Sequence, residues 1–367
     1  MRSVKILVCL LLVCCLLPTV SFGEEAPQVQ ELSVTGGVVR FTASAPIAAC
    51  CFTRIEKEPL ADSPDWVDCE GTSFSFFKYD GDYFLWLRDA EGRVSSPYPL
   101  TVRSGYHYFI DAEGLSPLQS PAQEVLDVQE ANAYIYEQAV EAGLYTREGV
   151  LSAGAAVLSY MGERGYTIPY QGKGAYQQEE DWGINPDFGK KLASPVTDAN
   201  GTYRYAGMQC VGALVWTFKL AGLNLSNEGT GWKIFNIGAL AKSNDNKIPY
   251  DKAIGGDLVV NGAHVLMIFD RLDKDGDGVD DTYLTYEMRS PHLLIMEHSM
   301  RSMRYLPFYS MENVYQNQSR YISKARFWPE TLRIPEEAFP ELLQQAVAQS
   351  GQKAALRHLL QGFHLTY

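Results

Sequence analysis

The sequence has little positive charge, and this deficit bears on its partners. Its 31 Lys and Arg residues face 44 Asp and Glu residues, so the formal net charge at pH 7 is −13. A chain with this charge repels a polyphosphate, which makes nucleic acid a poor candidate ligand. The sequence also has no internal repeat and no low-complexity tract. Its 367 residues, 46% of them hydrophobic, are enough for two globular domains.

Long apolar runs are lacking, apart from one near the start. The run Ile6–Leu17 follows a basic start and precedes small residues at Ser21 and Gly23. It is shorter than the ~20 residues that span a membrane, so residues 1–23 are predicted to be a cleaved secretory signal peptide. The mature protein is expected to be secreted, extracellular or cell-wall associated, without membrane contact. An uncleaved anchor is the alternative.

Few cysteines remain once residues 1–23 are removed: Cys50, Cys51, Cys69 and Cys210. They form no CxxC pair and have no adjacent His, which argues against a metal site built from them. In an exported protein, Cys69 is expected to form a disulfide with Cys50 or Cys51. Cys210 stands alone in the chain.

Residues 24–103 are rich in β-branched and aromatic residues and contain three turn signals, at Gly36-Gly37, Asp80-Gly81 and Glu91-Gly92. They predict a small all-β sandwich. The segment GDYFLWLRDAEGRVSSP resembles the penultimate hairpin of bacterial immunoglobulin-like modules. Such a module could attach to a wall or act as a spacer, and the sequence leaves both open.

Residues 104–124 contain several Gly and Pro and are predicted to be a linker. Helical periodicity then predicts helices over 125–142, 147–162 and 210–223. Strands are predicted from Asp257, Ala263 and Thr282, and residues 331–367 form a helical tail that packs on the rest. Residues 125–330 thus form a second domain, and the predicted fold class is α+β.

One constellation of residues suggests chemistry. Cys210 opens a helix, His264 begins a buried strand and Glu287 lies on the next strand. A helix N-terminus stabilises a thiolate, and an imidazole can take the thiol proton and later deliver it to a leaving amine. Glu287 could hold the imidazole in its productive tautomer. The alternatives are a small core cysteine, a buried histidine and a solvated carboxylate.

Four segments resemble, in order and spacing, the NlpC family of papain-like cell-wall peptidases: IPYQGKGAY at Ile168, DWG at Asp181, YAGMQCVGALVWTFKLAGL at Tyr205 and GGDLVVNGAHVLMIFD at Gly255. That family has a Tyr-x-Trp-Gly-Gly segment, an Asp-Cys-Ser-Gly-Phe-Val helix and a Gly-Asp-Leu-Val turn before a His strand. The segment TYEMRSP at Thr285 is similar to the Glu-bearing strand of the related CHAP amidases. The resemblance covers roughly residues 147–328.

The resemblance implies a role for each matching residue. Cys210 would be the nucleophile, His264 the base and Glu287 the third, orienting member. Tyr170 would help to stabilise the oxyanion beside the backbone N–H of Cys210. Gly256 and Asp257 would turn the chain into the His264 strand. The family needs no cofactor for this chemistry.

Two positions depart from the family. Gln209 and Val211 replace the Asp and Ser that flank the cysteine and contact the amine end of the substrate in most relatives. The implication is an altered substrate, such as a stem peptide without a free amino terminus, or an inactive copy.

An acidic segment, DKDGDGVDD, lies between the strands that carry His264 and Glu287. Its alternating carboxylates could bind a structural calcium ion through Asp273, Asp275, Asp277 and Asp281. Leu284 stands where an EF-hand has its acidic twelfth residue. A solvated acidic hairpin is the alternative.

The leading hypothesis is therefore a secreted, monomeric cysteine peptidase or amidase that hydrolyses peptide bonds of peptidoglycan stem peptides through an acyl-enzyme. The first alternative is a catalytically inactive wall-binding protein on the same fold. A transglutaminase-like protein fits less well, because GGDLV has no role there. If Glu287 is not the third member, the next candidates are His292, Glu297 and His298.

Overall fold

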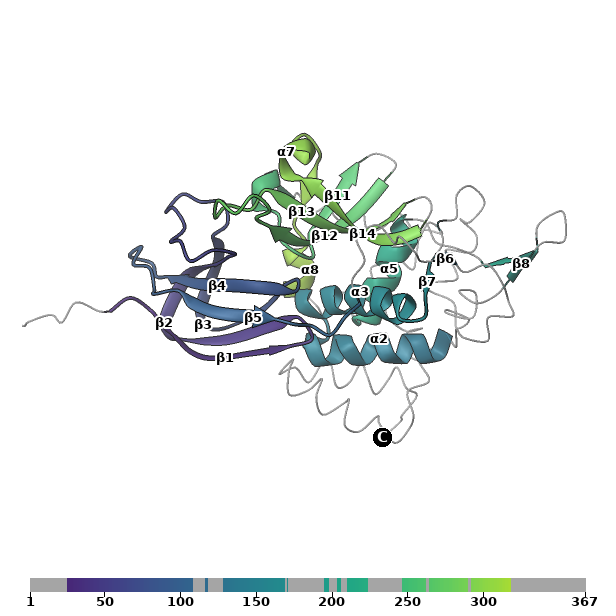
Figure 1. The fold of residues 1–367 in the computed structure, drawn as a ribbon, viewed down its shortest axis with the longest axis horizontal. Coiled ribbons are helices and arrows are strands. Elements are labelled where there is room, and N and C mark those ends of the chain that lie inside the picture. Colours follow the sequence, from purple (N-terminus) through teal and green to yellow (C-terminus); the bar gives the residue numbers. More distant parts are fainter. Residues whose placement is uncertain are drawn as a thin grey trace, which may run out of the picture.

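The computed structural model describes residues 25–107, 116–117, 128–168, 170, 195–197, 203–205, 210–223, 246–261, 264–289 and 292–317. This part of the chain forms two large antiparallel sheets, two small two-stranded sheets and helices that contact both large sheets, so the fold is of the predicted α+β class. Figure 1 shows the first sheet in purple and blue and the second in green. The predicted signal peptide and the helical tail lie outside the described residues.

The first sheet has five strands: β1 (Val29–Thr35), β2 (Val38–Thr53), β3 (Val67–Phe77), β4 (Gly81–Arg88) and β5 (Tyr98–Val102). Its order is β1-β2-β4-β5, and β3 also pairs with β2. Gly36 and Gly37 form the first predicted turn with φ angles of 55° and 83°, a region that glycine adopts at little cost.

The topology of this sheet differs from the predicted two-sheet sandwich, because all five strands are hydrogen-bonded into one sheet. The cause is the length of β2, whose first half pairs with β1 and whose second half pairs with β4. Its pairing with β3 shifts register between Thr42 and Ile47, where Pro46 has no N–H to donate. The resulting sheet curls around its own apolar core.

The cysteines of this sheet lie on opposite faces. Cys50 belongs to the enclosed core, and its side chain is hydrogen-bonded to that of Cys69. Cys51 packs instead with Trp66 and Trp86 on the other face. All three are free thiols in the structure, so the disulfide stays a prediction. The geometry restricts it to Cys50 and Cys69.

We expect protein from an oxidising compartment to contain the Cys50–Cys69 disulfide. Closing a loop of about 20 residues should add roughly 3 kcal/mol to the free energy of unfolding, so reduction should lower the melting temperature. Peptide mapping without reductant checks this. Recovery of both cysteines as free thiols would contradict the prediction, and Cys51, on the opposite face, is the internal control.

Two helices follow the first sheet: α2 (Val128–Gly143) and α3 (Arg147–Gly162). Thr146 caps α3, because its side chain accepts a hydrogen bond from the backbone N–H of Gly149. All residues of α3 from Gly149 to Gly162 are buried. Gly154 faces the ring of Tyr286, where an added Cβ would lie 3.6 Å from two ring atoms. The small residues of this helix therefore permit the close packing that the sequence predicts.

The second sheet has the order β10-β15-β11-β12-β13-β14. Its strands are β10 (Lys247–Ile248), β11 (Leu258–Asn261), β12 (His264–Leu272), β13 (Thr282–Arg289), β14 (His292–Ser299) and β15 (Phe308–Tyr309). Helices α3 and α5 (Cys210–Leu220) pack in the same hydrophobic core as β12 and β13. The predicted strands β11, β12 and β13 are confirmed, whereas sequence reasoning missed β14, which pairs with β13 along its whole length.

Short elements complete the described part of the chain: β6 (Ser116–Pro117), β7 (Tyr166–Thr167), β8 (Pro195–Thr197), β9 (Tyr203–Tyr205), the 3₁₀ helix η1 (Tyr250–Lys252), α7 (Met300–Met303) and α8 (Glu312–Gln316). Strands β6 and β7 pair in parallel. No helix among the described residues is long and apolar enough to cross a membrane.

The largest hydrophobic cluster, which lies in the second domain, also includes residues of the first sheet. Val38 and Phe77 of the first sheet and Tyr106 of the predicted linker belong to the same cluster as α3 and β12. The rings of Phe77 and Phe269 meet edge to face, with centroids 5.1 Å apart. Tyr106 also bonds to the hydroxyl of Ser152. The described start of the linker therefore packs against the second domain.

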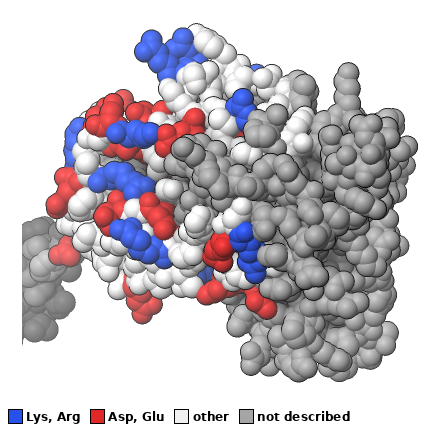
Figure 2. Space-filling model, turned by 45° about the vertical axis from the view of Figure 1, so that its right-hand side comes forward, with Lys and Arg blue, Asp and Glu red and all other residues white. Residues whose placement is uncertain are grey.

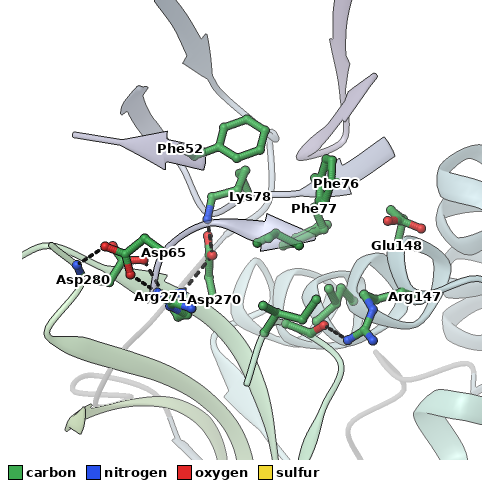
Figure 3. Close-up of a pocket in the computed structure, with 14 residues that line it drawn as sticks. Phe52, Asp65, Phe76, Phe77, Lys78, Arg147, Glu148, Asp270, Arg271 and Asp280 are labelled. Atoms are coloured by element: carbon green, nitrogen blue, oxygen red, sulfur yellow. Dashed lines mark hydrogen bonds and ion pairs between the residues drawn. The ribbon is translucent and has the colours of Figure 1, made fainter. Parts of the chain in front are cut away.

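Ion pairs with very low exposure reinforce this contact, as Figure 3 shows around a cavity of about 60 Å³. Lys78 pairs with Asp270, and Arg271 pairs with both Asp65 and Asp280. Because a buried charge is costly without its partner, the two pairs that cross between the parts, Lys78–Asp270 and Arg271–Asp65, fix how the two sheets dock. Figure 2 shows acidic and basic side chains interspersed on the described part of one face, without a continuous basic surface.

Candidate active site

Cys210 is the first residue of α5 and is 8% exposed. The first N–H groups of a helix have no partner within it, so the sulfur sits where backbone donors and the helix dipole favour negative charge. The rest of α5 is nearly all buried and anchors this end of the helix against the sheet. The predicted helix start at Cys210 is confirmed.

The turn before β11, the strand that precedes and pairs with the His264 strand, is fixed by a buried carboxylate. Asp257 is 2% exposed and accepts hydrogen bonds from Arg147 and from the backbone N–H groups of Ile254 and Met311. Gly256 has a φ angle of 87°, in the region that favours glycine. The Gly-Asp pair therefore turns the chain into β11, and β11 in turn pairs antiparallel with the His264 strand.

His264 and Glu287 meet across strands β12 and β13. His264 is the first residue of β12, and Glu287 lies on the neighbouring strand with only 2% of its side chain exposed. The Nε2 atom of His264 is 2.8 Å from Oε2 of Glu287. The Cys210 thiol lies close enough to the same imidazole to raise its pKa. The structure thus brings together the three residues that the sequence predicted.

The surroundings keep Glu287 ionised. Burial acts to raise the pKa of this carboxyl, but hydrogen bonds from His264, His298 and Thr285 outweigh burial and lower the pKa to about 2. An ionised carboxylate can only accept hydrogen bonds. The Nε2 atom of His264 must therefore carry a proton, which leaves Nδ1 for Cys210.

The same contacts make His264 a strong base. The interaction with the Cys210 thiol and then the hydrogen bond with Glu287 raise the pKa of His264 to about 9, against a smaller opposing effect of burial. A proton that moves from the thiol to this ring is therefore held there at neutral pH. The arrangement can supply a thiolate nucleophile and an imidazolium that later acts as a general acid.

Two further groups form hydrogen bonds with Glu287, and sequence reasoning placed neither of them next to it. His298 on β14 lies with Nε2 2.8 Å from Oε1 of Glu287, and the Thr285 hydroxyl donates to the same oxygen at 2.9 Å. The sequence marks His298 only as a substitute for Glu287, not as its partner. Glu297 and His292, the remaining substitutes, have different surroundings: Glu297 pairs with Lys274, and His292 is buried at the start of β14.

The remaining predicted site residues are less constrained. Tyr170 is 37% exposed, and its role at the oxyanion stays a prediction. Val211 is partly buried and packs against the core that contains Cys210. Gln209 lies outside the described residues, as do the matching segments at 171–176 and 181–183.

The acidic hairpin between β12 and β13 brings three predicted ligands together. One carboxylate oxygen from each of Asp273, Asp275 and Asp277 lies within 4.8 Å of the others. Asp281 is outside this group and accepts from the backbone N–H of Lys274 and from Thr282. Three clustered oxygen ligands suit calcium, so the residues fit the predicted ion.

Millimolar calcium is expected to raise the melting temperature by about 2–4 °C, because an ion that binds only the folded chain stabilises it. Calorimetry of the wild type and of Asp275→Asn checks this, with magnesium at equal concentration as the control for ionic strength. The solvated-hairpin alternative holds if calcium gives no binding heat and no shift.

No protein-family model matches this chain, and neither the curated proteins nor the solved structures contain a match to it.

Proposed function

We propose that this protein is a secreted cysteine peptidase or amidase with a papain-like catalytic domain, and that it hydrolyses peptide bonds in peptidoglycan. The observation that carries the proposal is the hydrogen-bonded pair of His264 and Glu287 beside the Cys210 thiol, with the sulfur at a helix N-terminus. If Cys210 were only a core residue and His264 had no role beside it, their closeness to each other and to a buried carboxylate would be unexplained. The resemblance to cell-wall peptidases supplies the substrate class.

Catalysis would begin with attack of the Cys210 thiolate on the carbonyl carbon of the substrate. The resulting oxyanion would lie near the free N–H groups at the start of α5, which can stabilise it. The His264 imidazolium then gives its proton to the leaving nitrogen, the C–N bond breaks and a thioester remains. Water, deprotonated by the neutral imidazole, attacks the thioester and releases the acid and the thiol.

Glu287 has a defined part in this cycle. Its carboxylate accepts from Nε2 of His264, so Nδ1 stays directed at Cys210. Its negative charge stabilises the imidazolium that forms when the thiol is deprotonated. The low pKa of Glu287, about 2, keeps this charge through the whole range in which the enzyme would work.

The most informative experiment identifies the bond that is cut. Purified muropeptides are incubated with the mature wild type and with Cys210→Ala, and the products are analysed by mass spectrometry. The proposal expects, only with the wild type, pairs of fragments whose masses add up to that of the parent plus one water molecule. Fragment masses then identify the bond. Intact muropeptides with both proteins, together with tight binding, would favour the wall-binding alternative.

A further inference from the structure

Glu287 is held by two imidazoles, one on each carboxylate oxygen. His264 donates from Nε2 to Oε2, and His298 lies with Nε2 2.8 Å from Oε1. The carboxylate itself is 2% exposed, whereas the His298 ring is 23% exposed. Because an ionised carboxylate only accepts, His298 must also carry its proton on Nε2.

We infer that His298 is a positioning residue of this site: it fixes the Glu287 carboxylate so that Oε2 faces His264. That this positioning matters for catalysis rests on the proposed function. A carboxylate with one partner can rotate about its terminal bond, since that torsion is broad. Bonds to both oxygens restrict this rotation. Thr285 also donates to Oε1, but its hydroxyl lies on the same strand as Glu287, so His298 is the partner that ties Oε1 to the neighbouring strand β14. The orientation of His264, and hence of Nδ1 toward Cys210, then depends in part on His298.

The strands explain why His298 can reach this carboxylate. In the ladder between β13 and β14, Glu287 is opposite Leu294, and His298 is opposite Tyr283. The Glu287 side chain therefore extends along its own strand toward His298, past Thr285, whose hydroxyl donates to the same oxygen. This contact needs a long acceptor and a ring whose far nitrogen donates. Glu287 on β13 supplies the long acceptor, and His298 on β14 supplies the partly buried ring.

Two substitutions at His298 distinguish the hydrogen bond that its ring donates from the space that the ring fills. His298→Gln places an amide N–H near the position of Nε2 and should keep the bond to Oε1. His298→Leu keeps bulk and removes the donor. Glu297→Gln is the matched control, because Glu297 is adjacent on β14 but pairs with Lys274.

The readout is the rate at which iodoacetamide alkylates Cys210 between pH 5 and 9, which needs no substrate. His298→Leu should slow alkylation at pH 6 roughly tenfold, the effect of losing one hydrogen bond to a charged group. His298→Gln and Glu297→Gln should stay within about twofold of the wild type, since neither removes that bond. The melting temperature is measured for each variant, so that unfolding is recognised.

A double-mutant cycle completes the test. If His298 acts through Glu287, then His298→Leu should have little further effect in a Glu287→Gln background. The inference is overturned if His298→Leu alkylates like the wild type, if His298→Gln is as slow as His298→Leu, or if the two substitutions act independently. If alkylation follows the expected pattern while muropeptides remain intact, the positioning role stands and the proposed substrate is wrong.

Discussion

Replacing Cys210 by Ala is expected to reduce turnover of the peptide substrate by at least about 10⁴-fold, because no other nucleophile can form the acyl-enzyme. The substitution removes one sulfur atom from the first position of α5 and leaves the helix and its contacts in place. Binding of wall fragments should therefore be unchanged. The measurements are the release of new amine ends and the affinity for purified fragments.

The matched control is Cys51→Ala. Cys51 is as buried as Cys210, but it packs with Trp66 and Trp86 on the first sheet and has no imidazole partner. This variant should keep full turnover and lose only some stability, as expected for a small core truncation. If the wild type and Cys210→Ala were equally active, Cys210 would not be the nucleophile.

Glu287→Gln should lower kcat by roughly 10²–10⁴-fold with little change in fold, because the amide cannot stabilise the imidazolium as a carboxylate does. The amide group of Gln can also place an N–H donor opposite Nε2 of His264, which is itself a donor in the wild type. This mismatch disturbs the tautomer of His264. Steady-state kinetics checks this expectation. Glu297→Gln is the same chemical change outside the series and should have little effect. Wild-type rates for Glu287→Gln would place the third member elsewhere.

The same substitution should shift the pH dependence in a defined direction. The carboxylate charge favours the imidazolium, so its loss must lower the pKa of His264 from about 9. Turnover needs the imidazolium as general acid, so the alkaline limit of kcat/KM should move to lower pH in Glu287→Gln. An unchanged alkaline limit would show that Glu287 does not act on this ring.

Linkage adds an effect on stability in the wild type. The pKa of Glu287 falls from 4.5 to about 2 on folding, so its contribution is present above pH 4.5 and is lost toward pH 2. The pKa of His264 rises from 6.5 to about 9, so its contribution is present below pH 6.5 and is lost as the pH rises through 9.

Local sequence signals predicted the elements that carry the site. Helical periodicity predicted α3 over residues 147–162, and the Gly-Asp pair predicted a turn, which the structure places before β11. The Cys210 helix and the strands of His264 and Glu287 have strong apolar patterns of the right length. Each of these signals is contained in a short stretch of sequence, which is why it could be read without the fold.

Long-range contacts could not be predicted in this way. Arg271 and Asp65 are far apart in the sequence, and nothing local marks them as partners. The place of His298 was missed because β14 was not recognised as a strand beside β13. The curled single sheet was missed because it depends on β2 changing partners along its length. These features arise from pairing between distant segments rather than from local propensity.

The central claim is that His264 makes Cys210 a reactive thiolate, and competitive alkylation tests it most directly. At pH 6, iodoacetamide should label Cys210 of the wild type faster than it labels free cysteine, because His264, with a pKa of about 9, holds the thiol proton. His264→Ala should lose this advantage. A Cys210 that reacts no faster than free cysteine, or equally fast without the imidazole, would contradict the account.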